Sequence, residues 1–124
     1  MARSFIDPTS QTPIFQQIID ELERRIITGV IKTDEFLPSV REFAVSNAVN
    51  PNTVAKAYQQ LQVLGLVESV RGMGLKARAV EDKKAQKRKD ELLNLKIDES
   101  LELAKALGIS PNQLIDLIRD RSRK

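Results

Sequence analysis

The 124-residue sequence predicts a mostly α-helical fold with one small β-hairpin. Three observations lead to this prediction. Apolar residues recur at helical spacing near the start of the chain and again near its end. Two short segments between these regions each begin with a helix-capping residue. After them, a loosely alternating stretch turns through two glycines, which is typical of a hairpin.

The first predicted helix covers residues 12–29. Its apolar residues follow helical spacing, Thr12 can cap its start, and Pro13 suits the first helical position. Gly29 provides a stop, because glycine readily adopts the left-handed conformation that ends helices. Residues 30–37 then form a short connector with room for one brief strand.

A second, short helix is predicted to begin after Ser39 and to end near Ala48. Ser39 and Glu42 stand three residues apart, which is the spacing of a capping box. In that arrangement each side chain accepts a hydrogen bond from the other residue's backbone N–H. The pair therefore marks where this helix starts.

The third predicted helix begins at Pro51, after a tight turn through residues 48–49. Asn50 can cap it, and proline is favoured at the first helical position because it lacks the N–H that would be unpaired there. The helix runs to about Leu64, with Gly65 as its stop. Two short helices joined by a tight turn, the second opened by a cap, indicate a helix-turn-helix.

This third helix has an apolar side and a polar side. The expected inward residues are Val54, Ala57, Tyr58, Leu61 and Leu64, the outward ones are Asn52, Lys56 and Gln59, and Thr53 and Gln60 flank these. Asparagine and glutamine can hydrogen-bond to base edges, and lysine can pair with phosphate. The polar side therefore suits a helix that enters the major groove of DNA. The alternative is a good cap followed by an ordinary solvated face.

After Gly65 the pattern changes from helical to alternating. We predict two strands, residues 66–71 and 75–80, joined by a turn through residues 72–74. A lone hairpin is marginal in water. We therefore expect it to pack on the helices or to pair with the connector.

The segment 81–91 is highly charged and has no helix breaker. It is interpreted either as a solvated helix or linker, or as a contact with the DNA backbone. Residues 92–107 continue as a helix whose apolar side chains spread over roughly half of its circumference. A last helix follows the cap at Ser110, and residues 119–124 are expected to fray as a basic tail.

The two C-terminal helices are expected to form a dimer. An exposed apolar stripe of this size would be a liability in a monomer. The alternative is that these helices fold back on their own domain. The predicted dimerisation residues are Leu92, Leu93, Ile97, Leu101, Ala104, Leu114, Ile115 and Ile118.

Composition excludes several classes of function. The chain has no cysteine and no histidine, so disulfides, thiolate or histidine metal sites and histidine-based catalysis are ruled out. We therefore expect no enzyme, no cofactor and no metal. The net charge of +3 is only a weak indication of a polyanionic partner. No apolar run approaches the length of a membrane span, so we expect a cytoplasmic protein with no membrane partner.

Three stretches, LPSVREFA (37–44), VNPNTVAKAYQQLQVLGLVES (49–69) and RGMG (71–74), resemble the winged helix-turn-helix signature of the GntR family of bacterial transcription regulators. The short two-helix tail is similar to that of the YtrA-type subgroup. The resemblance implies a winged helix-turn-helix DNA-binding domain at residues 1–80 and a helical dimerisation tail at residues 81–124.

The resemblance also implies a function. We expect a sequence-specific regulator that binds double-stranded DNA, acts as a repressor on a palindromic operator as a homodimer, and controls a transporter operon. An unknown small-molecule effector could bind between the tail and the winged helix. The alternatives are an activator, which would share the same DNA contacts, and a winged-helix module that binds proteins without DNA.

The DNA contacts implied by the resemblance lie on the second helix, the third helix and the wing. They are Arg41, Asn50, Asn52, Thr53, Lys56, Arg71 and Gly72. For three of these a second role is open: a surface salt bridge for Arg41, helix capping for Asn50, and turn geometry for Gly72.

Three places depart from the family pattern. Residues 33–34 are Thr-Asp where Pro-Gly is usual, so the connector is expected to turn differently. Residues 75–76 are Leu-Lys in place of Thr-Phe, which leaves the packing of the second wing strand open. Ala55 replaces an arginine of some relatives and removes one base-reading side chain.

Overall fold

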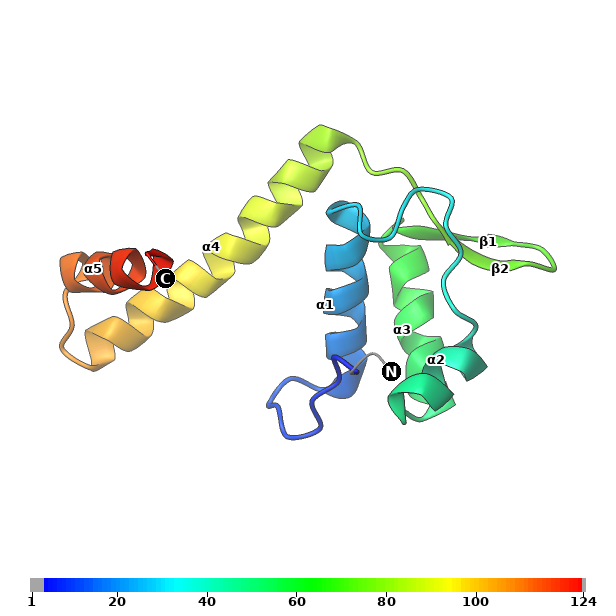
Figure 1. Cartoon of the computed structure of the whole chain (residues 1–124), viewed down its shortest axis with the longest axis horizontal. Helices are drawn as coiled ribbons and strands as arrows, with labels where there is room; N and C mark the ends of the chain where they lie inside the picture. Colours follow the sequence, from blue (N-terminus) through cyan, green and yellow to red (C-terminus); the bar gives the residue numbers. More distant parts are fainter. Residues whose placement is uncertain (1–3, 124) are drawn as a thin grey trace. The chain divides into compact units, whose positions relative to one another are not determined.

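The computed structural model describes residues 4–123, which form five helices and one two-stranded antiparallel sheet. The elements are α1 (Ile14–Ile27), α2 (Val40–Asn47), α3 (Pro51–Val63), β1 (Val67–Val70), β2 (Gly74–Ala77), α4 (Asp82–Ala106) and α5 (Pro111–Ser122), as Figure 1 shows. The chain divides into two compact units, the first ending at Asp82 and the second beginning at Lys83. The predicted fold class, mostly helical with a small hairpin, is confirmed.

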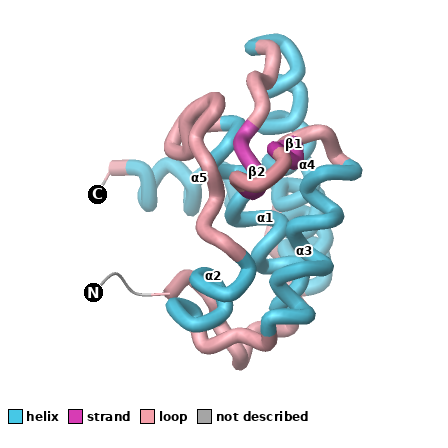
Figure 2. Tube along the Cα trace, turned by 90° about the vertical axis from the view of Figure 1, so that its right-hand side faces the viewer, coloured by secondary structure: helices cyan, strands magenta, loops and turns pink. Residues whose placement is uncertain are grey.

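The first unit is built around α3, which contacts α1, α2 and β1. Figure 2 shows α1 and α3 running beside each other, and Ile18, Val54 and Leu61 are fully buried. Burial of each such side chain contributes roughly 1.5–3 kcal/mol. The predicted inward residues of α3 are buried except for Leu64, which is 48% exposed. The helix ends at Val63, so Leu64 lies beyond the last regular turn and does not continue the inward stripe.

The start of α1 differs from the prediction. The helix begins at Ile14 with Pro13 as its N-cap, and among the described residues no side chain caps it. Thr12 instead presents its carbonyl to the amide of Gln17, which also donates to the carbonyl of Asp7. The predicted Thr12 cap is therefore wrong. The Gln17 side chain binds the backbone of the segment before α1 and holds that segment in a different conformation.

Both cap predictions for the helix-turn-helix are confirmed. Ser39 Oγ accepts from the backbone N–H of Glu42, and Glu42 Oε1 accepts from that of Ser39, both at 3.0 Å. Asn50 Oδ1 accepts from the backbone N–H of Asn52 at 2.8 Å, with Pro51 in the first turn. Between the helices, Ala48 adopts a left-handed conformation with φ of 53°. This residue makes the tight turn that separates α2 from α3.

The capping box predicts a pH dependence of stability. The hydrogen bond from the Ser39 backbone N–H holds the pKa of Glu42 below its ordinary value of 4.5. A depressed folded-state pKa means that the ionised carboxylate stabilises the fold above pH 4.5 and that this contribution is lost as pH falls through the lowered pKa. Glu42→Gln keeps an acceptor but cannot ionise. We expect denaturation midpoints of wild type and variant to converge as pH is lowered below 4.5, whereas parallel curves would contradict this role.

The hairpin is shorter than predicted but pairs as expected. Its register joins Val67 to Ala77 and Val70 to Gly74, so Gly74 belongs to β2 and not to the turn. The connector pairs with β2 through a single antiparallel bridge between Phe36 and Lys76. Beyond Ala77 the chain leaves the regular sheet and enters α4 at Asp82, which is why β2 does not extend to residue 80.

Two departures from the family pattern meet in this region. Asp34 has φ of 69°, so it adopts the left-handed conformation that a glycine would adopt there without strain. Its carboxylate pairs with Lys76 Nζ at 3.1 Å, and Glu68 pairs with the same ammonium at 3.4 Å. The hydrogen bond to Asp34 raises the pKa of Lys76. The substituted residues therefore tie the connector to the hairpin.

The second unit consists of α4 and α5. Helix α4 is one continuous helix of 25 residues, so the charged segment is helical and not a linker. Ser110 caps α5 in a capping box with Gln113. Figure 1 shows the chain turning through a short loop between the end of α4 and the start of α5.

The predicted fraying at the end of α5 is wrong for the described residues. The helix continues to Ser122, with ion pairs between Arg119 and Asp116 and between Arg123 and Asp120. Basic side chains in a last turn also complement the negative end of the helix dipole. Lys124 lies outside the described residues. Over the described part of the chain, no helix is both long and apolar enough to cross a membrane.

Candidate nucleic-acid interface

The outward side of α3 matches the prediction. Asn52, Lys56 and Gln59 are exposed, and Thr53 is half-buried. Within residues 4–123, the side-chain amide of Asn52 has no hydrogen-bond partner and the Lys56 ammonium has no ion-pair partner. Both the carbonyl oxygen and the NH2 group of this amide are therefore free to hydrogen-bond to a base edge. The positive end of the helix dipole at this terminus favours a nearby phosphate.

Asn50 serves as the helix cap. Its side-chain oxygen is held by the Asn52 backbone N–H, so the capping role that the sequence left open is present. The residue is exposed, and its amide nitrogen remains a donor that can reach a phosphate. One side chain can thus serve both roles, with a different atom in each.

Arg41 is exposed on α2. In the described part of the chain it forms no ion pair, so the alternative of a surface salt bridge is not realised. Tyr58 holds the start of α2 against α3, because its hydroxyl donates to the Pro38 carbonyl at 2.8 Å. The Tyr58 ring also meets Phe43 edge-on, with centroids 6.0 Å apart. Burial raises the pKa of the Tyr58 hydroxyl, which keeps it protonated as a donor.

The tip of the wing carries Arg71 and Gly72, both exposed. Gly72 has φ of +77°, and a Cβ added there would meet nothing within 4 Å. Turn conformation, and not crowding, is what requires glycine at this position. This geometry leaves the surface around Gly72 open, so the turn role and close approach to DNA are compatible.

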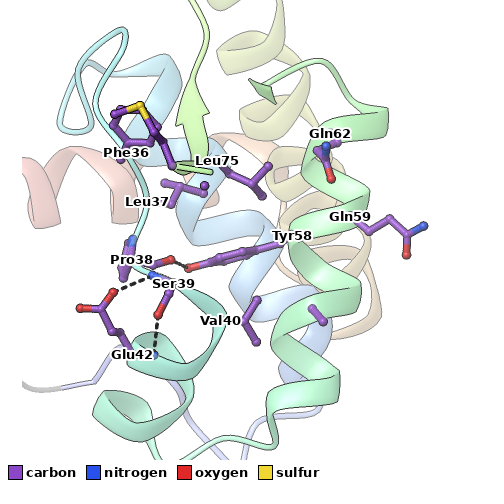
Figure 3. A pocket seen from close by; sticks show the side chains of 13 residues that line it. Phe36, Leu37, Pro38, Ser39, Val40, Glu42, Tyr58, Gln59, Gln62 and Leu75 are labelled. Carbon is purple, nitrogen blue, oxygen red and sulfur yellow. Dashed lines mark hydrogen bonds between the residues drawn. The ribbon is translucent and has the colours of Figure 1, made fainter. Parts of the chain in front are cut away.

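A groove of about 670 Å³ lies between α3 and the second wing strand (Figure 3). Leu37, Tyr58 and Leu75 contribute to its lining, and Gln59 and Gln62 line it from α3. In Figure 3 the Gln59 side chain points outward from α3. The sequence predicts that Gln59 faces outward, but Gln59 is not among the predicted DNA contacts. Its position beside Asn52 on the helical wheel, on the same side as Lys56, is the signal that identifies it.

The seven predicted DNA contacts all belong to the first unit. They lie on α2, at the start of α3 and at the wing tip, and all are exposed except the half-buried Thr53. Cationic, amide and hydroxyl groups are what phosphate and base-edge contacts require. The assignment of individual contacts stays a prediction. Among residues 4–123, no group of three or more acidic side chains forms a candidate metal site.

Comparison with known proteins places this geometry in a family. Residues 14–76, just over half of the chain, match the model described as bacterial regulatory proteins, gntR family. The HTH-type transcriptional repressor YtrA of Bacillus subtilis (strain 168) is 48% identical over 69 residues. That segment covers 56% of this chain and 53% of the repressor, so only about half of that relative is matched.

Two solved structures extend the comparison. A GntR family transcriptional regulator from Listeria monocytogenes superposes with a TM-score of 0.78 at 25% identity, covering 93% of this chain and 98% of that chain. The structure of AraR(DBD) in complex with operator ORX1 has a TM-score of 0.54 at 29% identity, covering 62% of this chain and 95% of that chain. The matched relatives are transcription regulators and not enzymes. The chain therefore belongs to the GntR family of bacterial DNA-binding transcription regulators, and it resembles the YtrA-type members of that family.

Proposed function

We propose that the protein is a homodimeric repressor that reads a palindromic operator and controls a transporter operon. The observation that carries the proposal is the outward side of α3, where Asn52 and Lys56 are exposed and unpaired within the described residues. A single winged helix covers a short stretch of DNA. A two-fold dimer reads two half-sites about 34 Å apart, one turn of the double helix.

The second unit supports the dimer. Five large apolar side chains on one side of α4 and at its C-terminal end, and three on α5, are exposed: Leu93, Ile97, Leu101, Leu103, Leu107, Ile115, Leu117 and Ile118. Of the predicted dimerisation residues, Leu92 and Leu114 are half-buried and Ala104 is buried, while the other five are exposed. So much exposed apolar surface on two helices favours association with a second copy.

The choice of operon rests on the YtrA-type resemblance, since members of this subgroup often repress genes of ATP-driven transporters and their own gene. A repressor of this kind acts by occupying a promoter, which places it with the DNA in the cytoplasm. The promoter upstream of the protein's own gene is therefore the first operator to test.

Fluorescence anisotropy with this promoter fragment and a scrambled duplex, at two salt concentrations, tests the proposal. We expect tighter binding to the promoter and weaker binding at higher salt, because phosphate contacts release counterions. Arg41→Ala is expected to weaken promoter binding by roughly 100-fold or more, through the removal of one charge-assisted hydrogen bond in each half-site. Equal affinity for the two duplexes would contradict control of its own promoter.

Arg24→Ala is the matched control for Arg41→Ala. Arg24 is also an exposed helical arginine, but Glu21 on the same helix pairs with it. The two variants change net charge equally. If both weakened promoter binding to the same extent, Arg41 would act only through overall charge and not through direct binding to the DNA.

A further inference from the structure

The first turns of α4 carry a concentration of positive charge that the winged helix-turn-helix does not account for. Lys83, Lys84, Lys87, Arg88 and Lys89 fall within seven residues. Lys83, Lys84 and Lys87 are exposed, and none of the three has an ion-pair partner in the described chain. Farther along the second unit, Lys96 pairs with Glu99 and Arg119 pairs with Asp116.

The position of these lysines is unfavourable for the helix itself. Positive side chains in a first turn oppose the positive end of the helix dipole. Lys83 and Lys87 stand four residues apart, as do Lys84 and Arg88, and like charges at this spacing destabilise a helix. Asp82 is the acidic residue in the first turn. The three lysines at the start of α4 therefore gain nothing from the helix dipole or from one another.

The three unpaired lysines share one side of the helix. At 3.6 residues per turn, Lys83, Lys87 and Lys84 fall within an arc of about 100°. Arg88 continues the same side and pairs with Glu91 at 3.3 Å. We call the surface formed by Lys83, Lys84 and Lys87 the basic face. It presents three ammonium groups that form no ion pair among the described residues, and Asp90 and Glu91 follow one turn after Lys87. A row of unpaired ammonium groups is complementary to a row of phosphates.

We infer that the basic face binds the DNA phosphate backbone next to the segment contacted by the winged helix. This inference rests on the proposed function, because it extends the same DNA complex. The basic face would add affinity and salt dependence without reading sequence, since lysine acts on phosphate as a point charge.

Chain length limits how far the basic face can lie from the base of the wing, the end of the hairpin opposite its turn. Six residues lead from Ala77, the end of β2, to Lys83. Six residues span at most about 20 Å even when fully extended. Double-stranded DNA carries a charge for roughly every 1.7 Å of its axis, so a helix face that reaches the duplex meets several phosphates.

Other polyanions fit the basic face less well. Residues 81–124 contain no aromatic side chain, so there is no stacking platform for single-stranded nucleic acid. The first ten residues of α4 contain no large apolar side chain that could enter a membrane surface beside the lysines. Double-stranded DNA requires neither feature.

The test compares the full-length protein with K83Q/K84Q/K87Q in anisotropy titrations on an operator duplex with ten flanking base pairs on each side. We expect the slope of log affinity against log salt to become shallower by about two to three per protomer, because each lysine–phosphate pair contributes roughly 0.9 to that slope. Affinity for operator and for scrambled DNA should fall by the same factor, so their ratio should not change. The melting temperature should stay the same or rise, because repulsion within α4 is relieved.

K96Q/K105Q/R119Q is the matched control, since it removes three positive charges from later in the same unit. Its slope should stay close to that of wild type, and an equal decrease in both triple variants would overturn the inference. An unchanged slope in K83Q/K84Q/K87Q would also overturn it, as would a lower melting temperature, which would assign the lysines to folding. Failure of wild type to prefer the operator would instead count against the proposed function.

Discussion

Replacing Asn52 with alanine is expected to remove about 1–3 kcal/mol of discrimination at one base pair in each half-site. Asn52 is exposed, and its side-chain amide is unpaired within the described residues. Its backbone N–H, not its side chain, takes part in the Asn50 cap, so alanine leaves the helix start intact. The measurement is a set of anisotropy titrations on operator duplexes that each carry one base-pair change.

Asn112 offers a close control for Asn52. It is also exposed, and it follows Ser110 and Pro111 at the start of α5 as Asn52 follows Asn50 and Pro51. Asn112→Ala should therefore leave the base preference unchanged. If Asn52→Ala weakened binding to every sequence equally, Asn52 would position the helix on phosphate and would not read a base.

The second large effect is expected from breaking the dimer. Leu93 and Ile97 lie one helical turn apart on α4 and are 63% and 51% exposed, so charged residues there should not disturb the fold of the protomer. The variant L93E/I97E places two carboxylates on the apolar surface proposed to meet the second copy. We expect monomers in analytical ultracentrifugation and operator affinity at least about 100-fold weaker, because the two half-sites are then bound independently.

Leu95→Glu separates dissociation of the dimer from a general effect of charge on α4. Leu95 is 55% exposed but lies on the other side of the helix from Leu93 and Ile97. This variant should remain dimeric and bind the operator normally. The proposed interface would be wrong if L93E/I97E stayed dimeric, or if Leu95→Glu dissociated the protein equally.

The elements best predicted from sequence are those set by local interactions. Ser39 and Asn50 determine the starts of α2 and α3 through hydrogen bonds to backbone groups two or three residues away. Such bonds depend only on neighbouring residues, so their spacing is visible in the sequence. The outward side of α3 was predictable for the same reason, because helical periodicity alone places Asn52 and Lys56 together.

The features that sequence did not predict depend on interactions that no local pattern reveals. Thr12 has a side chain that could cap α1, but the Gln17 side-chain amide instead donates a hydrogen bond to the backbone carbonyl of Thr12. The ion pair between Asp34 and Lys76 joins two unusual residues whose proximity only the folded hairpin reveals. The groove between α3 and the wing is lined by residues of the connector, α2, α3 and the hairpin, which are far apart in the sequence. No local sequence pattern therefore predicts it.

Selection of bound duplexes from a random DNA library, followed by sequencing, tests the central claim most directly. The full-length protein is incubated with the library at moderate salt, and recovered DNA is sequenced over successive rounds. We predict enrichment of two inverted half-sites with centres about 10 base pairs apart, the spacing that a two-fold dimer imposes. Recovery of DNA without any enriched sequence would contradict sequence-specific recognition by α3 and the wing.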